Sequence, residues 1–284
     1  MLKILLILCA SLLFSLPPAA HAAYRVEDLG DGLYAALAID GEGASSNAFF
    51  VVGESYVVAG GAHMTRAAIA GLLSIIPKVT SKPLRYFVLP HHHRGFSYID
   101  FDFPAGVDVI MTWQTREALR SEVRQPEYPI LFFSEGLTLD LGRNSTVVIT
   151  EVGRGHSEGD LLVYLPERKT LFTSDLLYVN SVGYLGDGYM REWITALEFI
   201  EQLQVKKIIP GHGPVSKEQA VTDFIKYFKS FLSKLLAAIE QGKTLEEIRQ
   251  EFALPRYRQL EGYERFMEVN LERAYQQLQE TLKN

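Results

Sequence analysis

The chain has 284 residues, 48% of them hydrophobic and 22% charged, which suits one large domain or one domain with a helical appendage. The formal net charge of −6 and the isoelectric point near 5.7 argue against a nucleic-acid-binding protein, which normally carries a basic face. Because Cys9 is the single cysteine, disulfide bonds cannot hold the fold together.

Residues 1–22 are predicted to be a secretory signal peptide. Lys3 gives them a positive start, the stretch 4–16 is almost entirely apolar, and small residues lead to a cleavage site after Ala22. We therefore expect an exported protein, either periplasmic or secreted. No later stretch reaches about 18 uninterrupted apolar residues, so the sequence predicts no membrane span.

Strands and helices alternate through most of the chain. Short apolar runs bounded by turn residues predict strands, and longer stretches of helical composition predict helices. The strands are expected at 33–39, 47–52, 56–59, 85–90, 107–111, 137–141, 146–152, 161–165, 170–173 and 207–210. The helices are expected at 65–76, 115–124 and 191–203. This order predicts a mixed α/β (α+β) fold.

The chain becomes helical in character after residue 215. Ser216-x-x-Gln219 and Thr244-x-x-Glu247 are candidate capping boxes, each of which would begin a helix. Apolar residues then recur at helical spacing, at Phe224, Phe228, Phe231, Leu235 and Ile239, and again at Leu260, Tyr263, Met267, Leu271, Ala274 and Leu278. We predict a main domain over 23–215 and a C-terminal helical extension over 216–284 that packs on it. A partner or dimer interface is the alternative reading of the same apolar stripes.

Five of the seven histidines stand where a metal site would need them. His91, His92 and His93 end an apolar run, His156 follows a predicted strand, and His212 lies in Ile-Pro-Gly-His-Gly. In an extended segment side chains two apart share a face, so His91 and His93 can bind one ion while His92 points the other way. Three neutral imidazoles leave a fourth tetrahedral position for water, the pattern of a catalytic zinc site.

These motifs, in this order, resemble the metallo-β-lactamase superfamily from about Tyr34 to Val215. The matching segments are the strand into His91-x-His93, the loop Gly153–Asp160 that holds His156, the hairpin into Asp175, and Pro210-Gly-His212-Gly-Pro214. The stretch Leu185–Trp193 is also similar to exported zinc metallohydrolases of quinoprotein relay systems. The resemblance implies a four-layer αββα sandwich, with two sheets inside, helices outside and metals at one edge.

The first motif departs from the family pattern His-x-His-x-Asp-His. Here Gly95 and Phe96 stand in place of the Asp-His pair, so a second metal site would keep only Asp175 and His212. The resemblance therefore implies one zinc ion per chain, held by His91, His93 and His156. Asp175 would be a further direct ligand or a hydrogen-bonding base, and His212 a supporting group or a substrate contact. Asp160 is interpreted as a turn or strand-start residue and not as a ligand.

Three functions fit this resemblance. The first is an exported zinc hydrolase in which metal-bound hydroxide attacks a small-molecule ester, thioester, lactam or phosphoester, with Asp175 and His212 as catalytic residues. The second is an iron enzyme similar to persulfide dioxygenases, with His91, His156 and Asp175 as iron ligands. The third is a non-catalytic metal-binding or assembly protein. The oligomeric state is left open, with the C-terminal helices as a possible interface.

Overall fold

The computed structural model describes residues 23–62, 65–92, 103–120 and 128–283. The predicted signal peptide, residues 1–22, therefore lies outside the described residues. The first part of the chain forms β1 (Tyr24–Gly30), β2 (Leu33–Ala38), β3 (Ala48–Val52), β4 (Val57–Gly61), α1 (Arg66–Val79), β5 (Leu84–Val88), β6 (Asp108–Ile110), α2 (Trp113–Arg120) and β7 (Ile130–Leu131).

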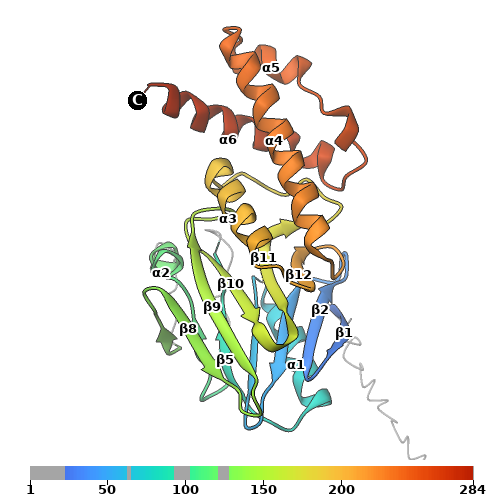
Figure 1. The fold of residues 1–284 in the computed structure, drawn as a ribbon, viewed down its shortest axis with the longest axis vertical. Helices are drawn as coiled ribbons and strands as arrows, with labels where there is room; N and C mark the ends of the chain where they lie inside the picture. Colours follow the sequence, from blue (N-terminus) through green and yellow to red (C-terminus); the bar gives the residue numbers. More distant parts are fainter. Residues whose placement is uncertain (1–22, 63–64, 93–102, 121–127, 284) are drawn as a thin grey trace, which may run out of the picture.

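The rest of the chain supplies a second set of strands and then the long helices (Figure 1). Its elements are β8 (Gly136–Asp140), β9 (Thr146–Gly153), β10 (Asp160–Leu165), β11 (Thr170–Tyr178), α3 (Met190–Gln202), β12 (Lys207–His212), α4 (Glu218–Glu240), α5 (Leu245–Glu251) and α6 (Tyr263–Lys283). Two 3₁₀ turns, Pro166–Arg168 and Pro255–Tyr257, connect neighbouring elements.

The strands form two sheets. The first has the order β1-β2-β3-β4-β5-β6-β7, antiparallel from β1 to β4 and parallel from β4 to β7. The second has the order β12-β11-β10-β9-β8, antiparallel except for the parallel pair of β11 and β12. Each sheet is therefore mixed, as the alternation of strands and crossover helices predicted.

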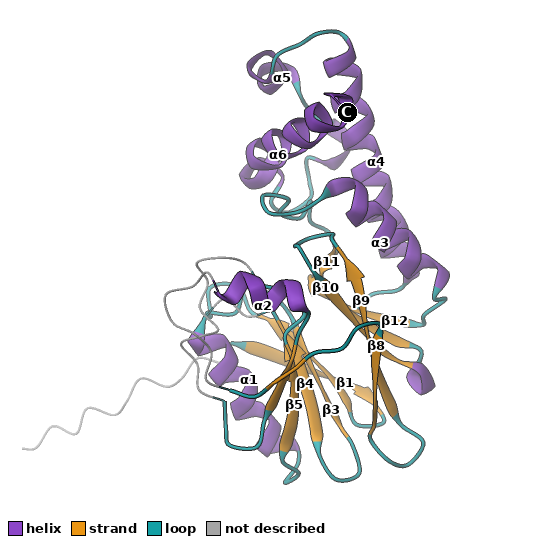
Figure 2. Ribbon diagram, turned by 90° about the vertical axis from the view of Figure 1, so that its left-hand side faces the viewer, coloured by secondary structure: helices purple, strands orange, loops and turns teal. Residues whose placement is uncertain are grey.

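The two sheets pack face to face, with helices on the outside (Figure 2). Phe49 of the first sheet and Phe172 of the second are both buried, and their ring centroids lie 4.8 Å apart in the core between the sheets. Helix α1 packs on the outer face of the first sheet, and α3 and α4 cover part of the second. The layers are thus helix, sheet, sheet and helix, which confirms the predicted αββα architecture.

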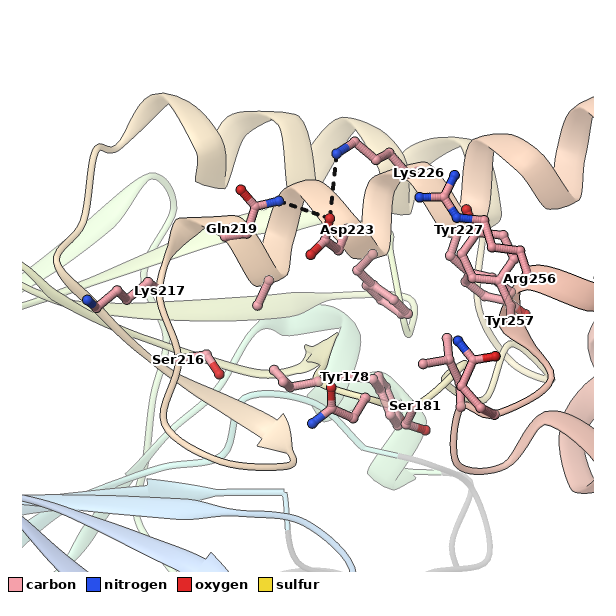
Figure 3. A pocket seen from close by; sticks show the side chains of 16 residues that line it. Tyr178, Ser181, Ser216, Lys217, Gln219, Asp223, Lys226, Tyr227, Arg256 and Tyr257 are labelled. Carbon is pink, nitrogen blue, oxygen red and sulfur yellow. Dashed lines mark hydrogen bonds and ion pairs between the residues drawn. The ribbon is translucent and has the colours of Figure 1, made fainter.

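A helical extension continues the chain beyond one end of the sandwich (Figure 1). The apolar stripe of α4 is buried against the chain's own residues, including those of α3 and β11. A groove of about 600 Å³ runs where α4 meets Tyr178, the last residue of β11, and Asp223 on its wall contacts Lys226 and Gln219 (Figure 3). Among the described residues no helix combines the length and the apolar character needed to cross a membrane.

Strand ends account for most differences from the sequence prediction. β1 was not predicted, because Arg25, Glu27 and Asp28 make it a polar, half-exposed edge strand. β5 ends at Val88 and not at residue 90, so His91 lies in a loop. β11 and β12 continue past their predicted ends, and the added residues belong to the candidate site.

One of the two predicted capping boxes is present. Thr244 accepts a hydrogen bond from the Glu247 amide, and the Glu247 carboxylate accepts one from the Thr244 amide at 2.8 Å. The box predicted at Ser216 is wrong, because α4 begins after Lys217 with no side-chain cap. The Ser216 hydroxyl instead donates to the Pro214 carbonyl.

We expect Thr244→Ala to lower the free energy of unfolding by about 1 kcal/mol, the usual loss when an N-cap hydroxyl is removed. Urea unfolding of the full chain measures this change. Ser216→Ala is the matched control, since Ser216 caps no helix and its loss should be smaller. Equal losses from both substitutions would contradict the difference in capping.

Candidate metal centre

Asp175 is placed by an irregularity in β11. Ser174 has a positive φ of 48°, and the pairing of β11 with β12 shifts register on both sides of it. Gly211 of β12 lies directly against this irregularity, because a Cβ at Gly211 would be 2.6 Å from the Asp175 amide nitrogen. The close approach of two backbones thus requires glycine at 211.

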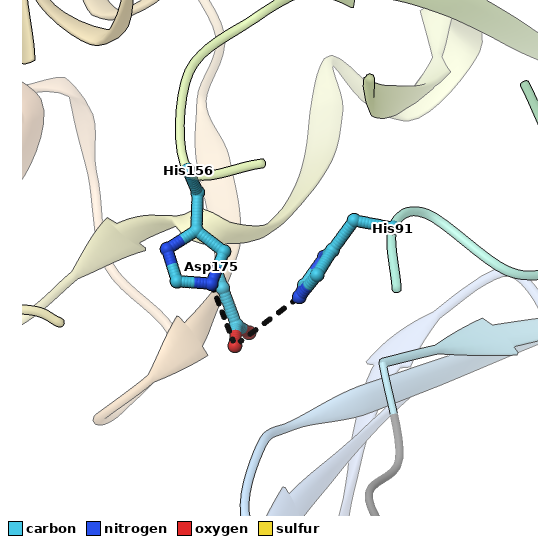
Figure 4. A group of neighbouring side chains, drawn as sticks. All are labelled: His91, His156 and Asp175. Atoms are coloured by element: carbon cyan, nitrogen blue, oxygen red, sulfur yellow. Dashed lines mark ion pairs between the residues drawn. The ribbon is translucent and has the colours of Figure 1, made fainter. Parts of the chain in front are cut away.

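Three histidines surround one oxygen of Asp175. Their Nε2 atoms lie 3.7 Å (His91), 3.8 Å (His156) and 3.4 Å (His212) from Asp175 Oδ2. His91, His156 and Asp175 are at most 2% exposed, and one ligand atom from each lies within 4.8 Å of the others (Figure 4). His212 is different, since 31% of its side chain is exposed.

The donor set fits a metal ion. Ligand atoms about 2.1 Å from one tetrahedral zinc lie about 3.4 Å apart, close to the spacing of the histidine nitrogens around Asp175 Oδ2. Asp175 Oδ1 is buried and accepts no hydrogen bond from the described residues. A buried carboxylate needs a compensating charge, which an ion held by His91, His156 and Asp175 would supply.

Histidine charge also favours the ionised form of Asp175. Burial alone raises the pKa of this carboxyl, but the positive charge of protonated His212, its hydrogen bond, and then the charges of His91 and His156 together lower it. The carboxyl is therefore ionised at neutral pH. An anion at this point is what a cation-binding site requires.

Aromatic side chains hold the histidine rings in place. The Tyr178 ring stacks on His212 at 4.2 Å and 7°, and the Trp193 ring contacts His156 edge-on at 4.9 Å. Trp193 is itself fixed by a 2.9 Å hydrogen bond from its indole nitrogen to the Leu176 carbonyl. On the other side, Ser174 Oγ lies 3.5 Å from His91 Nδ1. Such neighbours orient the imidazoles before any ligand binds.

Asn47 is a supporting residue that the sequence prediction missed. Its side-chain amide donates to the carbonyls of Pro210 (2.9 Å) and Gly213 (2.8 Å), and its oxygen accepts from the Ala38 amide. Asn47 thereby ties the first sheet to the segment that carries His212. An asparagine at the start of a predicted apolar strand was the one signal that the sequence offered, and the structure shows that it is buried.

The remaining predicted residues lie in several places. His93, Gly95 and Phe96 are outside the described residues, so His93 as a ligand stays a prediction. His92 is buried and lines a cavity next to the centre. Asp160 begins β10 and accepts a 2.7 Å hydrogen bond from Ser157 Oγ, which confirms its reading as a strand-start residue.

Two packed mixed sheets with outer helices, and a buried His/His/Asp cluster at one end, define an αββα protein with a candidate metal site. Residues 79–212 match the family model of the metallo-beta-lactamase superfamily. The match and the order of the motifs thus identify residues 79–212 as a segment similar to that superfamily.

Solved structures share the fold. A metallo-beta-lactamase from Pontibacter korlensis is 19% identical, with a TM-score of 0.62 over 72% of this chain and 99% of its own. DIM-1 metallo-beta-lactamase is 19% identical, with a TM-score of 0.61 over 73% of this chain and 97% of its own. At this identity the similarity establishes the fold and not the substrate. No curated protein matches the chain in sequence.

Proposed function

We propose that this protein is an exported metal-dependent hydrolase with one zinc ion per chain. The observation that carries the proposal is the buried carboxylate of Asp175 with three imidazole nitrogens within 3.8 Å of one of its oxygens. His91, His156 and Asp175 would hold the ion, and His93 is the further ligand that the sequence predicts. Export rests on the signal peptide predicted over residues 1–22.

A zinc ion held by these residues would supply polarisation of a carbonyl or phosphoryl oxygen and a lowered pKa of a coordinated water. The protein supplies the proton chemistry through Asp175 and His212. Asp175 Oδ2 lies 3.4 Å from His212 Nε2, within hydrogen-bond distance. His212 is partly exposed and Tyr178 stacks on its ring, so its imidazole is placed to contact a substrate and to act in proton transfer.

One observation favours a second candidate function. Among the described residues, the cluster that could bind an ion contains two histidines and one carboxylate, His91, His156 and Asp175. This 2-His-1-carboxylate set with open positions is the ligand pattern of non-haem iron oxygenases. It supports a mononuclear iron enzyme similar to persulfide dioxygenases as the alternative.

Metal analysis of the purified mature chain separates the candidates. We expect close to one zinc per chain, together with hydrolysis of an activated ester or thioester that a chelator abolishes and added zinc restores. Iron, with oxygen consumption in the presence of a persulfide, would support the second candidate. Failure of the chain to retain any metal would contradict both and leave a non-catalytic protein. Two tightly held ions would show that other groups complete the second site.

A further inference from the structure

Helix α6 of the extension contacts the segment 183–190, which is part of the connection from β11 to α3. Asn270 of α6 is only 1% exposed. Its side-chain amide donates to the Gly183 carbonyl at 2.9 Å, and its oxygen accepts from the Leu185 amide at 2.7 Å. A buried side chain of the extension thus fixes backbone that lies 85 residues earlier in the sequence.

Two further side chains of α6 hold the other end of this segment. Arg273 and Gln277 are four positions apart and so lie on one face of the helix. Arg273 Nε and the Gln277 amide both donate to the Gly188 carbonyl, at 3.0 and 2.7 Å. The Gln277 oxygen also accepts from the Met190 amide at 3.3 Å. Because Met190 begins α3 and Tyr189 gives that helix no side-chain cap, Gln277 of α6 caps α3.

The two ends of the segment reach the aromatic rings that orient the imidazoles of the metal centre. Helix α3, which begins at its end, carries Trp193, and the Trp193 ring contacts His156 at 4.9 Å. At its start, Gly183 lies against Tyr178, because a Cβ at Gly183 would be 3.1 Å from the Tyr178 ring. Tyr178 in turn stacks on His212. The contacts of α6 are therefore one step removed from both imidazoles.

The segment also contacts the loop of His156 directly. The Tyr189 amide donates to the carbonyl of Gly155, the residue before His156, at 2.7 Å. The Tyr189 hydroxyl donates to Glu158, two residues after His156. The two backbones are close, since a Cβ at Gly188 would lie 3.0 Å from the Gly155 carbonyl oxygen. Contacts with the segment thus flank His156 on both sides in the sequence.

We propose that Asn270, Arg273 and Gln277 of α6 are positioning residues of the metal centre, because they fix the segment 183–190 and this segment fixes His156. Groups that orient a metal ligand typically contribute 10–100-fold to metal affinity. Since such coupling is reciprocal, metal binding should stabilise the contact between α6 and the segment by the same factor. The effect on metal affinity rests on the proposed function, whereas the placement of the His156 loop does not.

The test removes both donors to the Gly188 carbonyl with the double substitution Arg273→Met and Gln277→Ala. We expect zinc affinity to fall about tenfold, the lower limit for a supporting group, because these residues act through the segment and do not touch the ligand. Chelator competition on the full chain measures the loss. Glu272→Gln is the matched control, since Glu272 precedes Arg273 in α6 but pairs with Arg249 of α5 at 2.8 Å. It should bind zinc as wild type does.

Hydrogen exchange of the metal-free proteins tests the positioning without a metal. In the double variant the backbone amides of 153–160 and 183–190 should exchange faster than in wild type, while those of β2 and β3 should be unchanged. A general loss of stability would instead raise exchange in all of these segments. Zinc added to wild type should slow exchange in 183–190, as the reciprocal coupling requires.

Wild-type zinc affinity in the double variant, an equal loss in the Glu272→Gln control, or unchanged exchange in 153–160 would each overturn the proposal. If wild type itself binds no zinc, the proposed function fails, and exchange in 153–160 alone decides this inference. Should the double variant not fold, Gln277→Glu takes its place, because glutamate keeps the acceptor for Met190 and loses only the donor to Gly188. Its effects should be smaller and of the same sign, and their absence would overturn the proposal.

Discussion

We expect His156→Ala to weaken metal binding by at least about 100-fold. Loss of a group that only supports a ligand typically costs 10–100-fold, and loss of a ligand should cost more. His156 is 1% exposed, and its Nε2 lies 3.8 Å from Asp175 Oδ2 in the group that could bind an ion. Metal content after dialysis against a graded chelator series measures the loss.

His92→Ala is the matched control for this experiment. His92 is also a buried histidine, 6% exposed, but it lines the neighbouring cavity and does not belong to the metal-binding group. Its substitution should leave metal retention close to that of wild type. Equal losses from the two substitutions would show that the ion lies elsewhere.

We expect Gly211→Ala to disrupt both the fold and the metal centre. The new Cβ would lie 2.6 Å from two backbone atoms, the Asp175 nitrogen and the Ser174 carbonyl carbon, so β12 must move away from β11. Overpacking of this kind costs typically 1–3 kcal/mol of unfolding free energy. Because Asp175 and His212 lie on the two displaced strands, metal affinity should fall as well. Urea unfolding and chelator competition measure the two effects.

Gly136→Ala is the control, because it tests whether alanine in place of any strand glycine would lower stability and metal affinity. Gly136 lies in β8, and a Cβ there would find its nearest atom, the Ile149 carbonyl oxygen, at an ordinary 3.5 Å. This variant should retain the metal and most of its stability. A folded Gly211→Ala protein with unchanged metal affinity would contradict the tight contact between β11 and β12.

Much of the fold could be predicted because its strands are short apolar runs. The apolar pattern failed to predict the strand where polar residues of the candidate site lie within it. Ser174 and Asp175 are polar, so β11 was predicted to end at residue 173, although the strand continues to Tyr178 with every residue buried. A buried polar residue inside a strand breaks the hydrophobic periodicity that identifies strands.

Part of the candidate site could be predicted because most of its residues lie in recognisable sequence motifs. Its histidines and Asp175 stand in short motifs, and the structure brings His91, His156, Asp175 and His212 together. Asn47 could not be assigned, since it acts on backbone far away in sequence and belongs to no motif. His91 and His93 were predicted to share a face because the strand was expected to continue into them. The strand β5 ends at Val88, so this alternation of side chains does not extend to His91.

The candidate ligands come from both sheets, since His91 follows β5 of the first and Asp175 lies in β11 of the second. An ion bound by these residues would cross-link the two sheets. With Cys9 the only cysteine, residues 23–284 can form no disulfide that does the same. An ion that binds only the folded chain would add about 2.7 kcal/mol to stability at a free-metal concentration 100 times Kd. Metal supply would then set part of the stability of the folded chain.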